Sequence, residues 1–345
     1  MPEFGVQTLD TDAVEIWARD HAPEIRGPIR AEKIAGGQSN PTYLLHAASG
    51  DFVLRRKPPG QLLKSAHAVD REYRVQSALA GTEVPVARMI ALCDDDSVIG
   101  SMFYVMERVH GVNHRDPRLP DLSPPERATV VDEMNRVLAA LHEVDVDAVG
   151  LSDYGPEGNY YERQISRWTK QYCASEMTPI PAMDRLIDAL GGRMPPDDGQ
   201  RTLVHGDYRI DNMIFDADTH RCNAVLDWEL STLGHPYADL AAVIMQWQLP
   251  TGPDGRGLAG FDRAEAGLPS DQAFIDRYCE RRGIRGIDDM GFYVAFAFFR
   301  MAAILQGVAK RAEDGNASDP ERGRAMGRYV PVFAQGGLHA LGETG

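Results

Sequence analysis

The chain has few cysteines and no excess of positive charge, and both absences narrow what it can be. Only four of its 345 residues are cysteine, and they lie far apart as Cys93, Cys173, Cys222 and Cys279. No pair has the CxxC spacing of redox or zinc sites, so we expect reduced thiols rather than disulfides or a metal cage. Asp and Glu number 51 against 36 Lys and Arg, a formal net charge of −15. This balance disfavours bulk binding to nucleic acid, which needs a basic face, and adhesion to anionic membranes.

The start of the sequence does not have the pattern expected of a signal peptide. Its first residues, MPEFGVQTLDTDAVEIWARD, are acidic and contain no apolar run, which argues against a signal peptide. The most apolar stretch, residues 291–310, is interrupted by Arg300, Gln306 and Lys310. This pattern predicts a buried core helix rather than a membrane span. We therefore expect a cytoplasmic protein, and the sequence does not indicate its oligomeric state.

The character of the chain changes once, near residues 107–113. Before this point the sequence predicts short strands with one helix, because DFVLRRK ends at Pro58-Pro59-Gly60 and AHAVDREYRVQSALAG has helical spacing. After it the sequence predicts mainly helices, among them one that begins with the capping box of Ser123 and Glu126. We expect an α+β fold with a nucleotide-binding N-terminal lobe over 1–107 and a helical catalytic and substrate-binding lobe over 108–345.

One short segment, LVHGDYRIDNMIFD (203–216), places ionisable groups between two apolar runs. Asp207 and Asn212 are five positions apart on this segment, and Asp227 ends the next predicted strand, about one hairpin later. Carboxylate and amide oxygens suit a hard cation such as Mg²⁺, which also binds substrate phosphates. A carboxylate left off the metal can accept a hydroxyl proton. This combination is what phosphoryl transfer requires.

The pattern H-G-D-x-x-x-x-N followed by D-W-E resembles the aminoglycoside phosphotransferase branch of the protein-kinase-like fold. The resemblance implies a bilobal fold with a mainly β N-lobe and a mainly helical C-lobe, with ATP and Mg²⁺ as cofactors. It implies that Asp207 is the catalytic base and that Asn212 and Asp227 are metal ligands. His205 then corresponds to a structural histidine that braces the loop. Arg209 would lie near the transferred phosphate, where many serine/threonine kinases carry lysine.

The same resemblance implies a phosphate-binding turn and a cation in the N-terminal half. The segment GGQSN (36–40), with Gly37, Ser39 and Asn40, could turn its backbone N–H groups toward phosphates. Arg55 occupies the place where the family usually has lysine, and arginine can fork onto phosphate oxygens. Lys57, two residues later on the same strand face, is the alternative.

The partner acid of that cation should lie on the next helix. Glu72 fits this place, and Asp70 is the alternative. The connector YVMERVHG then corresponds to the hinge between the lobes. Its backbone at Glu107 and Val109 would contact adenine, with Met106 as the inner wall.

A closer resemblance concerns the acceptor. The segments GGQSNPTYLL, LRRKPPGQLLKSAHAVDREYRV and ERQISRWTKQY are similar to the phosphotransferase-like domain of certain acyl-CoA dehydrogenase proteins and its stand-alone bacterial relatives. This similarity runs from about Ile34 to beyond residue 300. It implies a hydroxyacyl substrate, either as the free hydroxy acid or as its coenzyme A ester. On the predicted helix over 159–172, Arg163, Arg167 and Lys170 are spaced to share one face. Such a face suits an anionic substrate, although charges of this kind are as often simply solvated.

Three functions follow from these patterns. The first is an ATP-dependent kinase that phosphorylates a hydroxyl of a small molecule. The second is an aminoglycoside phosphotransferase, and the third is a nucleotide-binding pseudokinase scaffold, for which the arginine at position 55 is the one supporting feature. A protein kinase is disfavoured because no A-P-E-like segment follows the D-W-E.

Overall fold

The computed structural model describes residues 9–34, 40–58, 68–251, 257–316 and 319–343. The chain divides into two compact units. Unit 1 comprises Met1–His114, Ala148–Leu151 and Asn212–Ser231, and unit 2 comprises Arg115–Asp147, Ser152–Asp211 and Thr232–Gly345. The units are therefore not contiguous in sequence. The predicted boundary between residues 107 and 108 placed 212–231 with the helical part, but this segment belongs by its contacts to the strand-rich unit.

Unit 1 is built on an antiparallel sheet in the order β1-β2-β3-β5-β4. Its strands are β1 (Arg30–Lys33), β2 (Thr42–Ala47), β3 (Gly50–Arg56), β4 (Met89–Cys93) and β5 (Phe103–Glu107). The strand predicted in DFVLRRK is β3, which ends two residues before Pro58. Helix α2 (Val69–Leu79) is the helix predicted from AHAVDREYRVQSALAG.

The first helix of unit 1 was not predicted. Helix α1 (Thr11–His21) begins after Asp10, whose side chain accepts a hydrogen bond from the Ala13 N–H. Trp17 packs edge-on against Phe103 of the sheet, with ring centroids 4.8 Å apart. The expectation of a single helix before Gly111 was therefore wrong. The spacing of the buried Val14, Trp17 and Ala18 was the signal for this helix, because these positions share one helical face.

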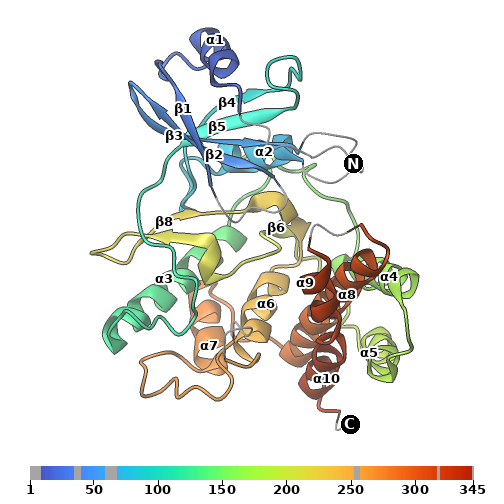
Figure 1. Ribbon diagram of the computed structural model, residues 1–345. Helices are drawn as coiled ribbons and strands as arrows, with labels where there is room; N and C mark the ends of the chain where they lie inside the picture. The colour runs from blue at the N-terminus through green and yellow to red at the C-terminus, as the bar shows by residue number, and fades with distance from the viewer. Residues whose placement is uncertain (1–8, 35–39, 59–67, 252–256, 317–318, 344–345) are drawn as a thin grey trace. The chain divides into compact units, whose positions relative to one another are not determined.

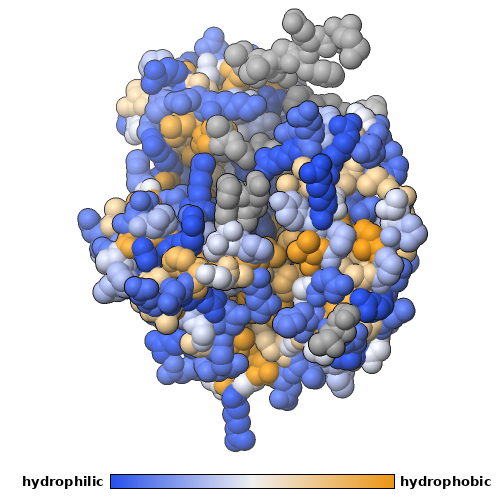
Figure 2. Space-filling model, turned by 60° about the horizontal axis from the view of Figure 1, so that its bottom comes forward, coloured by the Kyte–Doolittle hydropathy of each residue, from blue (hydrophilic) through white to orange (hydrophobic). Residues whose placement is uncertain are grey.

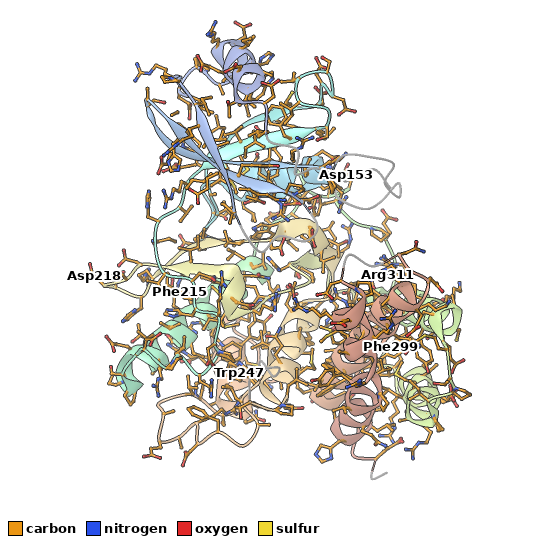
Figure 3. All side chains as sticks on the ribbon, in the orientation of Figure 1. Asp153, Phe215, Asp218, Trp247, Phe299 and Arg311 are labelled. Carbon is orange, nitrogen blue, oxygen red and sulfur yellow. The ribbon has the colours of Figure 1, made fainter. Side chains whose placement is uncertain are left out.

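A second part of unit 1 is the hairpin of β7 (Met213–Phe215) and β8 (Cys222–Val225), followed by the 3₁₀ turn η2 (Trp228–Leu230). Phe215 is fully buried, and Figure 3 places Asp218 at the tip of this hairpin. The Leu226 N–H donates to the Asn212 carbonyl over 2.8 Å, which extends the hairpin by one step. Asn212 therefore lies at the same end of the hairpin as Asp227.

Unit 2 is mainly helical (Figure 1). Its helices are α3 (Pro124–His142), α4 (Tyr160–Ser175), α5 (Pro181–Gly192), α6 (Tyr237–Trp247), α7 (Asp271–Arg281), α8 (Met290–Glu313), α9 (Pro320–Gly327) and α10 (Val330–Ala340). The predicted capping box of Ser123 and Glu126 opens α3. Strand β6 (Thr202–Val204) pairs with β9 (Thr232–Gly234), so the two apolar runs around the charged segment have different partners. The 3₁₀ turn η1 (Ile210–Asn212) runs from unit 2 into unit 1.

Helix α8 lies at the core of unit 2 and packs against α4, α5, α6, α9 and α10. By length and composition it could cross a membrane, but 67% of its most apolar window is buried inside the structure. The buried core helix predicted over 291–310 is therefore confirmed. The face of the molecule in Figure 2 is mostly hydrophilic, and its apolar residues are scattered in small groups.

Candidate active site

The predicted cation of unit 1, Arg55, lies among acids. Its Nε is 2.9 Å from Glu72 Oε2, and its Nη2 is 2.8 Å from Asp227 Oδ1 and 3.5 Å from Glu229 Oε2. The Nε–H does not point at the Glu72 oxygen, so this buried group has no aligned hydrogen bond among the described residues. We call Arg55, Glu72, Asp227 and Glu229 the acid-rich cluster. It contains three carboxyl groups and one cation. Glu229 is the glutamate of the D-W-E pattern, to which no separate role was assigned from the sequence.

Glu72 is 1% exposed and is held by neutral donors as well as by Arg55. The Asn40 amide donates to Glu72 Oε1 over 2.7 Å, and the Tyr104 hydroxyl donates to Oε2 over 3.1 Å. Burial raises the pKa of Glu72 to about 7. Arg55 opposes this rise, whereas Asp227 and Glu229 add to it. The pKa of Arg55 is also raised, because these acids outweigh its own burial. Glu72 therefore titrates in a range where an ordinary glutamate is fully ionised.

The sequence left two choices for the cation and two for its acidic partner, and the structure pairs them differently. Lys57, the alternative cation, has its Nζ 3.7 Å from the carboxylate of Asp70, the alternative acid. Arg55 and Glu72 are much more buried than this second pair. Only Arg55 lies beside the predicted metal ligand Asp227. Contact of either cation with phosphate stays a prediction, and Gly37 and Ser39 of the predicted phosphate turn lie outside the described residues.

The residues predicted to bind Mg²⁺ offer suitable donors. Asn212 is buried and Asp227 is partly exposed, and both supply oxygen atoms of the kind that Mg²⁺ prefers. Asp227 has a left-handed backbone, with φ of 64° and ψ of 59°, which is uncommon for a residue other than glycine. Among the described residues no group of three or more His, Cys, Asp and Glu forms a metal site. Two protein ligands fit a metal whose other positions are taken by water and phosphate.

The predicted hinge continues from β5. The Glu107 N–H already donates to the Arg88 carbonyl over 2.9 Å. The Val109 N–H, by contrast, has no hydrogen-bond acceptor within the described part of the chain. Met106 is half-buried on β5. Val109 is thus the hinge position with a free donor, and adenine contact by these residues stays a prediction.

In unit 2 a buried carboxylate fixes the backbone in front of Asp207. Asp239 of α6 accepts the His205 N–H over 2.6 Å and the Gly206 N–H over 2.8 Å. Although burial alone would raise the pKa of Asp239, hydrogen bonds and the nearby histidines lower it. His142 Nε2 lies 3.5 Å from the same carboxylate, and burial lowers the pKa of His142. Asp239 is therefore an ionised brace for this loop.

The loop side chains form a small ionic group of their own. The Asp207 N–H donates to His205 Nδ1 over 3.2 Å, so His205 makes the bracing contacts predicted for it. Arg209 lies between two acids, with Nε 3.2 Å from Asp207 Oδ2 and Nη1 3.2 Å from Asp211 Oδ2. Asp207 falls in unit 2, whereas Asn212 and Asp227 fall in unit 1. The roles of these residues as base, phosphate contact and metal ligands stay predictions.

The three basic residues predicted on one helical face lie on α4. Arg163 Nη1 donates to the Glu157 carbonyl over 2.6 Å and also to the Gly158 carbonyl, so it is tied to the loop before the helix. Arg167 and Lys170 are exposed. No carboxylate of the described residues lies within ion-pair distance of these three cations. None of the three cations therefore takes part in an ion pair within the described residues.

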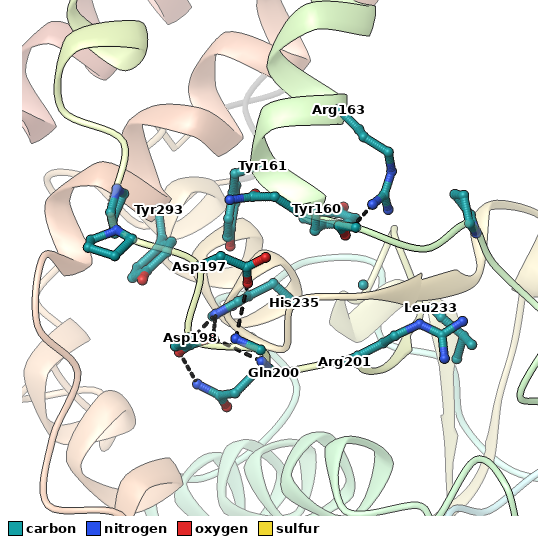
Figure 4. Close-up of a pocket in the computed structure, with 17 residues that line it drawn as sticks. Tyr160, Tyr161, Arg163, Asp197, Asp198, Gln200, Arg201, Leu233, His235 and Tyr293 are labelled. Atoms are coloured by element: carbon teal, nitrogen blue, oxygen red, sulfur yellow. Dashed lines mark hydrogen bonds and ion pairs between the residues drawn. The ribbon is translucent and has the colours of Figure 1, made fainter.

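Arg163 also borders a cavity of about 160 Å³ in unit 2 (Figure 4). Tyr161, His235 and Tyr293 line one side, and Figure 4 shows the Tyr161 ring pointing toward the loop that carries Asp197. His235 Nε2 is 3.3 Å from Asp198 Oδ1. Sequence analysis had not identified this cavity, because its residues come from α4, β9, α8 and a loop before β6.

Comparison with known proteins gives matches over most of the chain. The profile of the family described as "Phosphotransferase enzyme family" (APH) matches residues 30–274. Mouse acyl-CoA dehydrogenase family member 10 is 47% identical over 85% of this chain and 27% of its own length. Rat acyl-CoA dehydrogenase family member 11 is 40% identical over 97% of this chain and 44% of its own length. The chain thus spans less than half the length of these curated relatives.

Two solved structures are also similar. A candidate aminoglycoside phosphotransferase from Ralstonia eutropha is 47% identical, with a TM-score of 0.89 over 96% of this chain and 98% of that one. The aminoglycoside phosphotransferase APH(4)-Ia, in a ternary complex with ADP and hygromycin B, is 16% identical, with a TM-score of 0.63 over 96% of this chain and 100% of that one. The second match shows the fold alone. The predicted α+β, kinase-like fold is confirmed.

Proposed function

Because the chain belongs to the phosphotransferase enzyme family, we propose that it transfers the γ-phosphate of ATP to a hydroxyl group of a small molecule. The observation that carries this proposal is the braced loop in front of Asp207. A buried, ionised Asp239 accepts two consecutive backbone N–H groups there. A loop held in this way can keep a general base in one position, and positioning is most of what phosphoryl transfer asks of a protein.

In this proposal the residues have separate tasks. Asp207 accepts the proton of the acceptor hydroxyl. Arg209, which is ion-paired with Asp207, offsets the negative charge of the transferred phosphate beside it. Arg55 contacts the nucleotide phosphates, since it lies beside Asp227 and is permanently charged. Asn212 and Asp227 would hold Mg²⁺, which neutralises phosphate charge when it is bound. A structural relative of low identity binds ADP, which supports the choice of an adenine nucleotide.

For the acceptor we propose a hydroxy acid or a hydroxyacyl-coenzyme A. Two kinds of support exist. Relatives 40–47% identical to this chain carry acyl-CoA dehydrogenase names, which suits an acyl substrate. The cations of α4 form no ion pair with a carboxylate of the described residues, although the chain as a whole carries a net charge of −15. Unmatched cations favour an anionic ligand.

An aminoglycoside acceptor is the second candidate, favoured by the name of the Ralstonia eutropha protein. Aminoglycosides are polycations, and the arginines of α4 would repel them. If the protein bound ATP but transferred phosphate to no acceptor, the scaffold function would replace both candidates.

The decisive experiment is a screen for phosphorylated product. Purified protein with Mg²⁺ and ATP is incubated with hydroxyacyl-coenzyme A esters, the corresponding hydroxy acids, aminoglycosides and neutral polyols, and products are identified by mass spectrometry. We expect product from the acidic acceptors. Product from aminoglycosides alone would overturn the proposed acceptor class, and ATP binding without any product would overturn transfer.

A further inference from the structure

Arg300 is an unusual residue for its place in the fold. It is the one charged residue between Met290 and Ala309 in α8, the helix at the core of unit 2. A guanidinium within an apolar helix is costly unless its donors are engaged. The structure shows one such engagement, because Nη2 donates to the Gly206 carbonyl over 2.9 Å. Gly206 immediately precedes Asp207 in the chain.

An aromatic ring connects Arg300 to the arginines of α4. The Cζ atom of Arg300 lies 5.9 Å from the centre of the Trp168 ring, and that of Arg167 lies 5.4 Å from the same ring. Tyr160 is the first residue of α4, and burial raises the pKa of its phenol, although Arg300, Arg163 and Arg167 act to lower it. Its phenol stays neutral and is no counter-ion. We call Arg163, Arg167, Lys170 and Arg300 the cationic cluster.

Within the described residues the cationic cluster has no ion-paired acid, unlike Arg263 and Arg281 of the same unit. Arg263 lies 2.8 Å from Asp271, and Arg281 lies 2.7 Å from Asp132. No carboxylate among the described residues lies within 4 Å of Arg300 or of the three cations on α4. An arginine with spare donors and a nearby indole can bind the flat, two-oxygen face of an oxyanion.

We propose that Arg300, together with Trp168 and Arg167, binds an oxyanion group of the acceptor and holds it beside the loop that carries Asp207. This inference rests on the proposed function, since it assigns a ligand group to the same site. It adds a residue that the family pattern did not supply. One donor of Arg300 binds the Gly206 carbonyl, and the proposal assigns its remaining donors to the ligand.

The contact with Gly206 limits how far the oxyanion can lie from the reacting hydroxyl. Neighbouring Cα atoms are about 3.8 Å apart, so Arg300 acts within a few bonds of Asp207. A carboxylate on a short hydroxy acid fits this reach. The phosphates of coenzyme A lie much farther from an acyl hydroxyl, so we expect the carboxylate to be the group that is bound.

A binding experiment tests this without catalysis. 3-Hydroxybutyrate is titrated into the wild type while tryptophan fluorescence is recorded, and a Trp168→Phe variant identifies the source of the signal. We expect saturable binding that weakens about 10- to 100-fold in Arg300→Gln, the loss for a charged hydrogen bond. Arg300→Lys, which keeps the charge in a folded protein, should weaken binding less.

Arg311→Gln on the same helix is the matched control (Figure 3) and should bind normally. Equal binding by the wild type and both Arg300 variants, or none in the wild type below about 10 mM, overturns the inference.

Kinetics then identify the source of the oxyanion. The acceptors are 3-hydroxybutyrate, its coenzyme A ester and its neutral pantetheine ester. A raised KM in Arg300→Gln for the free acid alone supports carboxylate binding, and a raised KM for the coenzyme A ester alone supports binding of its phosphates. An equal loss on all three, with binding in the titration unchanged, overturns the inference in favour of loop support. If the wild type phosphorylates none of them but the titration still depends on Arg300, the proposed function fails and the oxyanion site stands.

Discussion

The acid-rich cluster of unit 1 and the cationic cluster of unit 2 have opposite imbalances of charge. In the first, Arg55 lies among three carboxyl groups, Glu72, Asp227 and Glu229. In the second, four cations have no carboxylate partner among the described residues. An excess of carboxylates suits a bound cation, and an excess of guanidinium groups suits a bound anion. Taken separately, the acid-rich cluster suits the proposed metal, and the cationic cluster suits the proposed acidic acceptor.

Two buried acids show how the surroundings of a carboxyl group decide its charge. Glu72 and Asp239 are each 1% exposed. The pKa of Glu72 is raised to about 7, because burial and two neighbouring acids outweigh Arg55. The pKa of Asp239 is lowered, because backbone N–H groups and histidines outweigh burial. Equal burial thus accompanies a raised pKa for the acid in unit 1 and a lowered pKa for the acid in unit 2.

The largest effect should come from removing a carboxylate of the acid-rich cluster. Asp227→Ala deletes a proposed metal ligand and should lower kcat/KM by on the order of 10³-fold or more, because a catalytic metal contributes several kcal/mol. Steady-state assays across a Mg²⁺ titration measure this. Full rescue by moderate Mg²⁺ would place the metal elsewhere. Asp218→Ala, at the hairpin tip, is a control that should be silent.

Asp207→Asn should have the next largest effect, a loss on the order of 10²-fold or more in kcat with ATP binding retained. The change removes the proposed proton acceptor and leaves unit 1 intact. Calorimetry with ATP and single-turnover assays separate the two effects. Nearly normal turnover would contradict the assignment of Asp207 as the base.

Replacing Arg55 tests whether its acidic surroundings serve nucleotide binding. Arg55→Met should raise KM for ATP about 10- to 100-fold, since it removes the proposed charged contact to phosphate. The matched control is Lys57→Met, which breaks the exposed 3.7 Å pair with Asp70 and should change KM little. The reverse ranking of these two variants would make Lys57 the phosphate contact.

Much of the fold and part of the site could be predicted from the sequence, because they depend on residues close together in the chain. The capping box at Ser123 and the apolar run over 291–310 are such patterns, and both became helices. Tyr104 contacts Glu72 only because β3 and β5 place it opposite Arg55, and sequence spacing does not give strand register. Arg300 was visible as a charge in an apolar run, but its contact with Gly206 depends on tertiary packing.

The raised pKa of Glu72 makes stability depend on pH in a defined direction. Its value is about 7 in the folded protein against an ordinary 4.5, so between these values the folded state holds a proton that the unfolded state has lost. This contribution is fully present below about pH 4.5 and is lost as the pH rises through about 7. Relative to Glu72→Gln, the wild type should therefore lose on the order of 1–3 kcal/mol across this window. Urea midpoints of both proteins between pH 4.5 and 8 measure the difference. A constant difference would mean that Glu72 is ionised throughout.

The smallest effect concerns two arginines of the cationic cluster on α4. If Arg163 and Arg167 help attract an anionic acceptor, the double change to Ala should raise KM for that acceptor several-fold and leave KM for ATP unchanged. The effect is small because exposed charge pairs contribute about 1 kcal/mol or less each. Such binding would be felt similarly in the ground and transition states, so kcat should stay constant. Added salt should reproduce the loss in the wild type, since exposed charges are screened over about 8–10 Å at physiological ionic strength.

Arg324→Ala, which removes an exposed arginine already paired with Glu313 at 3.2 Å, is the control. An unchanged KM for the acidic acceptor, or an equal rise in KM for a neutral one, would contradict this prediction. Arg300 alone would then remain of the proposed anion site, and a cationic acceptor would again be a candidate.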